Sequence, residues 1–313
     1  MKIEGTELLE QPAGEMWKKI RVELNEDVTT RDKDLAHIKE WLKKQPHLPD
    51  EWDDQRIMTF LRGCSFSLEK CKRKLDMYFT MRAAAPEFFT NRDVNKPPLR
   101  NVMSNKVQGP PLPGLTPNGR RVIVCRGVDD KLESHEITDT LKLALMIGDV
   151  RLFEETEGVG GDIYVLDGRV LAPSHLGKLS PAVLKKFFIC VQEAYPVKMK
   201  EAHIINASPV VEAFVNFVKP FLSEKLRKRI FIHKNLGDLY KYVPQDMLPE
   251  EYGGKAGSMN DLNEAWLKKL GEYADWFAEQ ESVKANEDLR PGKPTNYDEL
   301  FGIDGSFRQL AID

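Results

Sequence analysis

The chain has 313 residues, of which 41% are hydrophobic and 30% are charged, and its formal net charge is −3 at pH 7. This composition is ordinary for a globular protein and excludes a fibrous or largely disordered chain. The net charge argues against general nucleic-acid binding, which needs a broad positive field. A chain of this length is expected to form one main domain and a smaller one.

The first predicted unit, residues 1–93, is charged and has the apolar spacing of amphipathic helices. One helix is expected to begin near Asp53. Ser67 is expected to cap another helix that stops near Pro86, since serine is a favoured N-cap and proline ends helices. We therefore predict a small, all-helical N-terminal domain.

The second predicted unit, residues 94–256, opens with a stretch rich in proline and glycine, 97–119, which is expected to be a linker or wrapping loop. Strands and helices then alternate. Strands are predicted at 121–126, 162–167, 203–206 and 229–233, and helices at 136–157 and from Ser180-Pro181 onward. This alternation predicts an α/β domain with a mostly parallel sheet. Residues 257–313 are expected to form a C-terminal helix and a polar tail.

The helix predicted between the last two strands is apolar around most of its circumference. Its apolar positions are Val210, Val211, Phe214, Val215, Phe217, Val218, Phe221 and Leu222. Only Glu212, Asn216 and Lys219 form a polar stripe, whereas an ordinary surface helix is polar outside one apolar stripe. Two interpretations remain open: a buried core helix, or a lid with one face over an internal ligand and the other toward a bilayer.

A dense group of basic residues flanks this helix. It contains Lys198, Lys200, Lys225, Arg227, Lys228 and Arg229. A solvated charged face would be the usual explanation of such a run. Beside so apolar a helix, it favours a site for phospholipid headgroups, because each basic residue near an anionic leaflet contributes about 1 kcal/mol.

The remaining sequence features give no support for an enzyme. There is no nucleophile elbow and no zinc-protease motif, and the glycines at 158–161 precede a strand, where a dinucleotide fingerprint would follow one. His203 and His233 are expected to be structural, and Asp167 to form a turn. The glutamates at 154, 155 and 157 are expected to form the solvated end of a helix. No cofactor is expected.

Cysteine usage and hydropathy predict a cytoplasmic location for the chain. The four cysteines show neither C-x-x-C pairing nor a histidine at metal spacing, so reduced thiols are expected and no metal site is predicted. The polar N-terminus predicts no signal peptide. No apolar run approaches the roughly 20 residues of a spanning helix, so any membrane contact is expected to be peripheral.

Several motifs resemble those of the CRAL-TRIO family of lipid-binding proteins. DIYVLDG, EAYP, HIIN, VKPFLSEKLRKRI and LPEEYGG occur between residues 162 and 254 in the family's order, and residues 53–89 resemble its helical N-terminal domain. Each motif is weak alone, but five in sequence are specific. The likeness is greatest to the branch of α-tocopherol transfer protein and cellular retinaldehyde-binding protein. It implies an α/β domain around a hydrophobic pocket under a movable helical gate.

The resemblance also implies which residues bind lipid. Phosphatidylinositol bisphosphate is expected at a basic cleft made of Arg62, Lys198, Lys200, Lys225 and Arg229. The gate corresponds to the helix of Val210 to Leu222. The yeast phosphatidylinositol-transfer branch differs at the positions of Val197, Leu226 and Arg229. This difference favours a neutral, isoprenoid-like ligand inside and the phosphoinositide outside.

We therefore expect a monomeric, intracellular carrier that transfers one hydrophobic ligand between membranes. Vitamin E, a retinoid, a carotenoid or another lipid would suit such a pocket, and the anionic membrane surface is the expected partner. An alternative is a lipid-sensing module that recruits or scaffolds a partner protein. Mass spectrometry of co-purifying molecules separates the two, because only a carrier should retain a single stoichiometric lipid.

Overall fold

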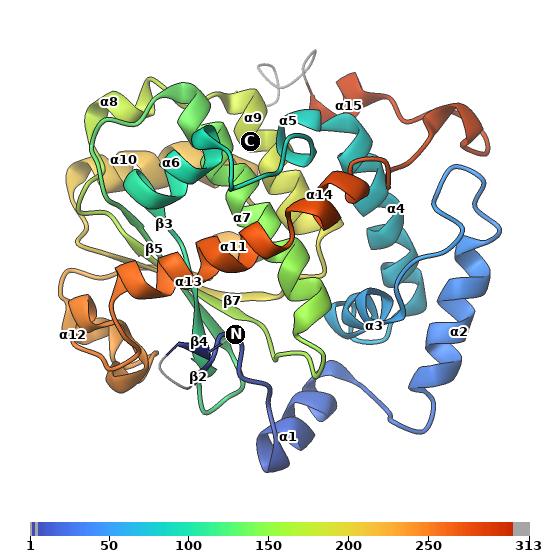
Figure 1. Cartoon of the computed structure of the whole chain (residues 1–313), viewed down its shortest axis with the longest axis horizontal. Helices are drawn as coiled ribbons and strands as arrows, with labels where there is room; N and C mark the ends of the chain where they lie inside the picture. Colours follow the sequence, from blue (N-terminus) through green and yellow to red (C-terminus); the bar gives the residue numbers. More distant parts are fainter. Residues whose placement is uncertain (1, 4–5, 303–313) are drawn as a thin grey trace.

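The structure is a computed structural model that describes residues 2–3 and 6–302. Its N-terminal part comprises β1 (Lys2–Ile3), β2 (Thr6–Glu7), α1 (Gly14–Leu24), α2 (Arg31–Leu42), α3 (Asp54–Gly63), α4 (Leu68–Ala84) and α5 (Pro86–Phe89). Helix α3 begins where the sequence predicted, because the Asp53 side chain accepts a hydrogen bond from the Arg56 amide over 2.8 Å. Helices α2, α3 and α4 lie together on the right of Figure 1.

A mostly parallel sheet forms the centre of the molecule, and the predicted α/β class is confirmed. Its strands are β3 (Val107–Gln108), β4 (Pro111–Leu115), β5 (Arg121–Gly127), β6 (Asp162–Asp167), β7 (Met199–Ile205) and β8 (Ile230–Ile232). Among the described residues the order is β3-β5-β6-β7-β8, with β4 also paired to β5. Strands β5 to β8 are parallel, and β3 and β4 run antiparallel to β5.

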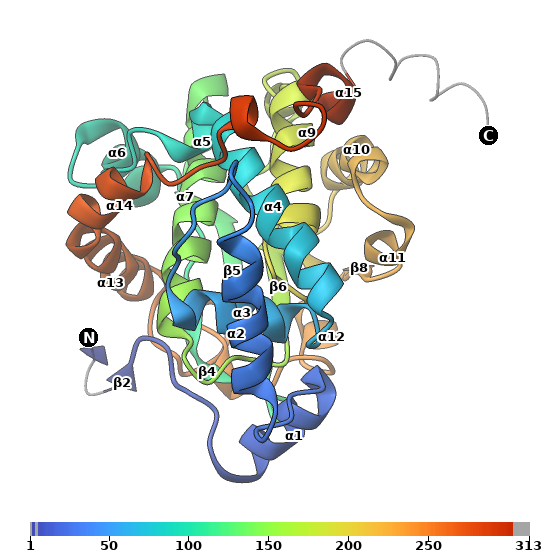
Figure 2. The same ribbon diagram turned by 90° about the vertical axis from the view of Figure 1, so that its right-hand side faces the viewer.

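Helices complete the order of elements. They are α6 (Pro97–Asn105), α7 (Ser134–Glu154), α8 (Pro173–Leu176), α9 (Pro181–Ile189), the π-helix η1 (Cys190–Ala194), α10 (Pro209–Val218), η2 (Lys219–Phe221), α11 (Glu224–Arg227), α12 (Leu236–Leu239), η3 (Gln245–Met247), η4 (Glu250–Tyr252), α13 (Met259–Glu272), α14 (Ala274–Gln280), η5 (Glu287–Leu289) and α15 (Tyr297–Phe301). Figure 2 shows α13 and α14 on one side of the molecule and α10 and α11 on the other.

The crossover helices of the parallel strands share one face of the sheet. Helix α7 joins β5 to β6, α9 with η1 joins β6 to β7, and α10 with α11 joins β7 to β8. Right-handed crossovers between sequential neighbours place all their helices on the same side. The contacts agree: Asp162 pairs with Arg151 of α7, and Leu166, which points to the same side of β6, packs against α10.

The two faces of the sheet are covered unequally. On one face, Val124, Val165 and Ile205 are completely buried under the chain between α12 and α13. On the crossover face, Tyr164 and Leu166 of the central strand β6 are only half-buried. The close-packed face stabilises the fold. On the crossover face, side chains of the central strand β6 are less buried than is usual for the centre of a sheet.

Two expectations are wrong: that residues 97–119 form a loop, and that one continuous helix follows residue 257. Residues 97–119 are not a loop, because they form α6, β3 and β4. Pro97 and Pro98 occupy the first turn of α6, where proline is tolerated, and the apolar side of the helix is buried. The helix expected after residue 257 is broken at Tyr273 into α13 and α14.

Shared cores join parts that are far apart in the sequence. Leu145 of α7 and Phe301 of α15 are buried in the same cluster as the apolar side chains of α2, α3 and α4.

The glutamates at the end of α7 were expected to be solvated, and this expectation is wrong for Glu155. Glu155 is buried between Arg121 and Arg151, with nitrogen–oxygen distances of 2.8 and 3.0 Å. Sequence spacing could not reveal these distant arginines.

Candidate functional site

Helix α10, together with η2 and Leu222, is the segment that was expected from the sequence to be a gate, and few of its side chains are buried. Ser208 caps its first turn by accepting a hydrogen bond from the Val211 amide. In α10 only Val211 and Val215 are buried, and both pack on Ile204. The remaining gate side chains are Val210, Phe214, Phe217, Val218 and Phe221, which are half-buried, and Leu222, which is buried. The predicted polar stripe is exposed to solvent.

The close approach of α10 to the sheet depends on a glycine. A Cβ at Gly168, in the turn after β6, would lie 2.4 Å from a methyl carbon of Val211. Asp167 holds this turn by accepting hydrogen bonds from the Arg169 amide and the Asn206 side chain. Asp167 therefore has the structural role in a turn that the sequence predicted.

The C-terminal end of the gate is held by residues that sequence reasoning missed. Gln192 of the π-helix donates to the carbonyl oxygen of Phe221 over 2.8 Å and accepts from the Ser223 amide over 2.9 Å. The ring of Phe221 stacks on Phe188 of α9, with centroids 6.2 Å apart and 9° between the ring planes. A π-helix departs from the 3.6-residue period of an α-helix. The spacing of apolar residues therefore did not predict the contacts of Gln192 with the end of this segment.

The basic cluster lies at the start of β7 and along α11. Lys198 and Lys200 flank the first residue of β7, next to Gly161, whose φ of +129° and close approach to the Lys198 carbonyl would strain any larger residue. Lys225 is exposed on α11, and Arg229 donates to the Met199 carbonyl oxygen. Burial, followed by the positive charges of Lys200 and Lys225, lowers the pKa of Lys198 to about 8. These four cations therefore share one neighbourhood.

Arg62 does not belong to the exposed cluster, and the structure corrects that expectation. Its side chain is buried, and its guanidinium donates to both carboxylate oxygens of Glu26 over 3.0 and 3.1 Å and to the Thr156 carbonyl. A buried arginine that is already paired has a structural role. The family resemblance assigned Arg62 to the basic cleft but could not reveal Glu26 as its partner.

His203 of β7 and His233, the residue after β8, are buried against each other. His203 Nδ1 and His233 Nε2 are 2.9 Å apart, and His203 Nε2 lies 3.0 Å from a carboxylate oxygen of Glu201. Burial lowers the pKa of His203. This pair fits the predicted structural role. In the described part of the chain, no group of three histidine, cysteine or acidic side chains could hold a metal ion.

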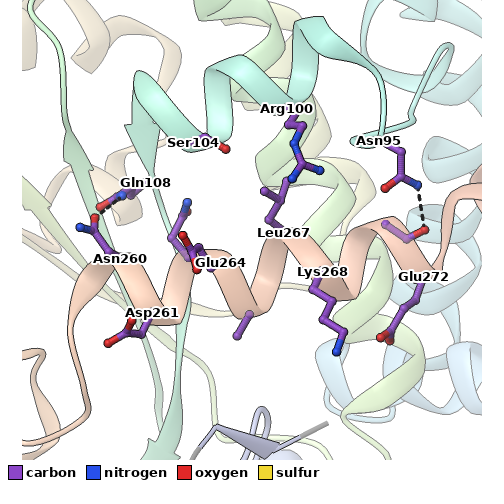
Figure 3. Close-up of a pocket in the computed structure, with 13 residues that line it drawn as sticks. Asn95, Arg100, Ser104, Gln108, Asn260, Asp261, Glu264, Leu267, Lys268 and Glu272 are labelled. Atoms are coloured by element: carbon purple, nitrogen blue, oxygen red, sulfur yellow. Dashed lines mark hydrogen bonds between the residues drawn. The ribbon is translucent and has the colours of Figure 1, made fainter.

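Two surface hollows lie away from the gate. One, of about 890 Å³, is bounded by α6 and α13 and is lined mainly by polar residues, with Arg100, Ser104, Glu264 and Lys268 among its labelled residues (Figure 3). The other, of about 580 Å³, is lined by residues 46–56 and 280–286. Neither includes a residue of the gate, so neither is the predicted ligand pocket.

Comparisons with known proteins agree with this geometry. A family profile described as CRAL/TRIO domain matches residues 108–254, and one described as Pinta-like, UBA domain matches residues 27–99. Residues 108–254 therefore form a domain of the CRAL-TRIO family. In the described residues, no helix is long and apolar enough to cross a membrane.

Its relatives include two kinds of protein. A mouse protein named alpha-tocopherol transfer protein-like is 28% identical over 77% of this chain and 70% of its own length. Clavesin-1 of Xenopus laevis is 27% identical over 76% of this chain and 72% of its own length. The crystal structure of Sfh5 covers 83% of this chain and 98% of its own at 16% identity, with a TM-score of 0.44 that is too low to carry an argument.

Proposed function

We propose that this protein carries one neutral, tocopherol- or retinoid-like isoprenoid under the α10 gate and transfers it between membranes. The names of the relatives support transfer as the activity, since the mouse protein is called transfer protein-like. The neutral class of cargo follows from the apolar surroundings of the gate. A mostly apolar ligand gains roughly 25 cal/mol per Å² of apolar area removed from water, and it needs few polar groups for orientation.

The unequal cover of the sheet is the observation that carries the proposal. Val165 of β6 is completely buried on one face, whereas its neighbours Tyr164 and Leu166 on the other face are half-buried beneath the crossover helices. Burial raises the pKa of the Tyr164 phenol well above its usual value. A hydrophobic guest between the sheet and α10 would complete that cover.

The attachment of the gate suggests how the cargo leaves. Only two side chains of α10 are buried, whereas the rings of Phe214, Phe217 and Phe221 are half-buried. In water these rings favour the closed position. A bilayer offers them an apolar environment, so contact with a membrane shifts the population toward an open gate.

The basic cleft is proposed to hold the protein on the donor or acceptor membrane during this exchange. Its members are Lys198, Lys200, Lys225 and Arg229, of which Lys225 is exposed and the other three are half-buried. A phosphatidylinositol bisphosphate headgroup is the proposed ligand, because its phosphates accept charge-assisted hydrogen bonds from several cations at once. The protein would therefore associate with membranes peripherally.

Replacing Phe217 and Phe221 together with serine tests the gate. We expect transfer of a fluorescent tocopherol analogue between vesicles to slow about tenfold or more, because the open gate loses two apolar side chains that stabilise it in lipid. Equilibrium affinity for the same analogue should fall much less. Stopped-flow transfer rates and equilibrium titrations measure the two quantities.

Phe153→Ser is the matched control, because Phe153 of α7 is 40% exposed but lies outside the gate. This variant should transfer the analogue at the normal rate. If the double variant loses rate and affinity to the same extent, α10 is an ordinary core helix and the gate proposal fails.

A further inference from the structure

A carboxylate of the chain itself occupies part of the basic cleft. Glu23, the penultimate residue of α1, accepts from Lys200 Nζ at one carboxylate oxygen over 2.6 Å. Its other oxygen accepts from Arg120 Nη1 over 2.8 Å. One anion therefore bridges two cations that are far apart in the sequence, in the way that a phosphate group bridges paired basic residues.

Arg120 is prepared to hold an anion at this position. Its Nη1 also donates to the carbonyl oxygen of Gly160, and any Cβ at Gly160 would lie 2.1 Å from the same nitrogen. The missing side chain of Gly160 leaves room for the Arg120 guanidinium, and the Gly160 carbonyl holds it there by a hydrogen bond. Gly161, the next residue, lets Lys200 approach from the neighbouring strand. The two cations thus converge on the turn that precedes β6.

The carboxylates of Glu23 and Glu26 differ in accessibility. Glu26 is fully enclosed among Arg21, Arg31 and Arg62, so it is a permanent part of the structure. The Glu23 side chain is 35% exposed. Burial raises its pKa, but the hydrogen bonds from Arg120 and Lys200 outweigh this effect and the pKa is lowered overall. Glu23 is therefore anionic at neutral pH and accessible to a competing anion from solution.

The geometry points to a second anion subsite, formed by Lys200 and Arg120, which Glu23 occupies until a second phosphate of an inositol headgroup displaces it. This inference rests on the proposed function and deepens it. Lys198 and Lys225 provide the first subsite, which a single phosphate can occupy while Glu23 stays in place. A headgroup with two phosphates also uses the second subsite, so Arg120 becomes a ligand and the cleft distinguishes bisphosphates from monophosphates.

Removing the internal competitor should strengthen only the interaction that has to displace it. A site that is open for a fraction of the time has its affinity reduced by that fraction. An accessible ion pair contributes up to about 1 kcal/mol, which corresponds to about a fivefold change in affinity. We therefore expect Glu23→Gln to raise affinity for bisphosphate headgroups about fivefold and to leave affinity for monophosphate headgroups unchanged.

The experiment compares full-length wild type, Glu23→Gln, Arg120→Gln and Glu15→Gln. Glu15 lies on the same helix α1 and pairs with Lys18 at the surface, so its variant removes the same charge away from the basic cluster. Vesicles contain phosphatidylinositol 4-phosphate or phosphatidylinositol 4,5-bisphosphate at matched surface charge. Sedimentation gives the affinities, and thermal melting checks that each variant is folded.

The subsite predicts a specific pattern. Glu23→Gln should gain affinity and Arg120→Gln should lose affinity for bisphosphate vesicles only, with Glu15→Gln like wild type on both. Equal gains on both kinds of vesicle, or no gain from Glu23→Gln, would overturn the subsite while leaving the basic cleft intact. If wild type binds neither vesicle, the proposed membrane function fails instead. Calorimetry with soluble inositol 1,4,5-trisphosphate then tests the subsite alone: a gain from Glu23→Gln supports it with a free inositol phosphate as ligand, and no gain overturns it.

Discussion

Reversing Lys198, Lys200, Lys225 and Arg229 to glutamate should abolish binding to vesicles that contain phosphatidylinositol bisphosphate. Each basic residue near an anionic surface contributes about 1 kcal/mol, so removing four attractions weakens binding about a thousandfold, and the four new repulsions weaken it further. The effect should diminish at high salt, because exposed charges are screened. Uptake of a tocopherol analogue from detergent should remain nearly normal, since the proposed cargo site under α10 does not include these cations.

A matched variant separates a local site from overall charge. Lys44, Lys255, Lys268 and Lys284 are exposed and lie outside the cluster. Reversing these four to glutamate changes the net charge by the same amount and should leave most vesicle binding intact. Unchanged vesicle binding by the first variant, or equal loss by both variants, would rule out the basic cleft as the headgroup site.

Replacing Asp149 with asparagine should lower the free energy of unfolding by about 3–5 kcal/mol, because two buried arginines would lose their counter-charge. The Asp149 carboxylate is completely buried and lies 3.0 Å from Arg82 and 2.6 Å from Arg92. It also accepts hydrogen bonds from the hydroxyls of Tyr78 and Tyr195. This network joins α4, α7 and the residue that follows the π-helix. Urea denaturation measures the loss.

The same carboxylate predicts a response to acid. Burial raises the pKa of Asp149, but the charges of Arg82 and Arg92 outweigh this and lower it overall. A depressed folded pKa adds stability above the unfolded value of about 4, and this stability is lost as pH falls through the folded pKa.

Glu40→Gln is the control for Asp149→Asn. It removes one partner of an exposed ion pair and should lower the free energy of unfolding by less than about 1 kcal/mol. A similarly small cost for Asp149→Asn would show that the network is not needed for stability.

The sequence predicted the elements whose signals are local. The apolar run of β6 and the β-branched run of β5 identified buried strands, and Ser180 and Asp53 identified helix starts that their side chains do cap. Helix α10 was predictable because its apolar residues at helical spacing exceed what one face can bury. All of these signals lie within a few residues of the elements that they predict.

Features that depend on distant partners could not be predicted. Arg62 matches the motif of a basic cleft, but whether it is free depends on Glu26, 36 residues earlier. Glu155 is buried because of Arg121 and Arg151, and α6 forms because its apolar side packs against α7 and α13. Tertiary contacts override local propensity in each case.

The central claim is that a lipid binds between the sheet and α10. Mass spectrometry of chloroform extracts from protein purified without detergent tests this claim most directly. We predict one hydrophobic, neutral species at close to one molecule per chain, displaced when the protein meets bisphosphate vesicles. An extract with no lipid, or with a mixture well below stoichiometry and a protein partner that co-purifies tightly, would contradict the carrier and favour a scaffolding module.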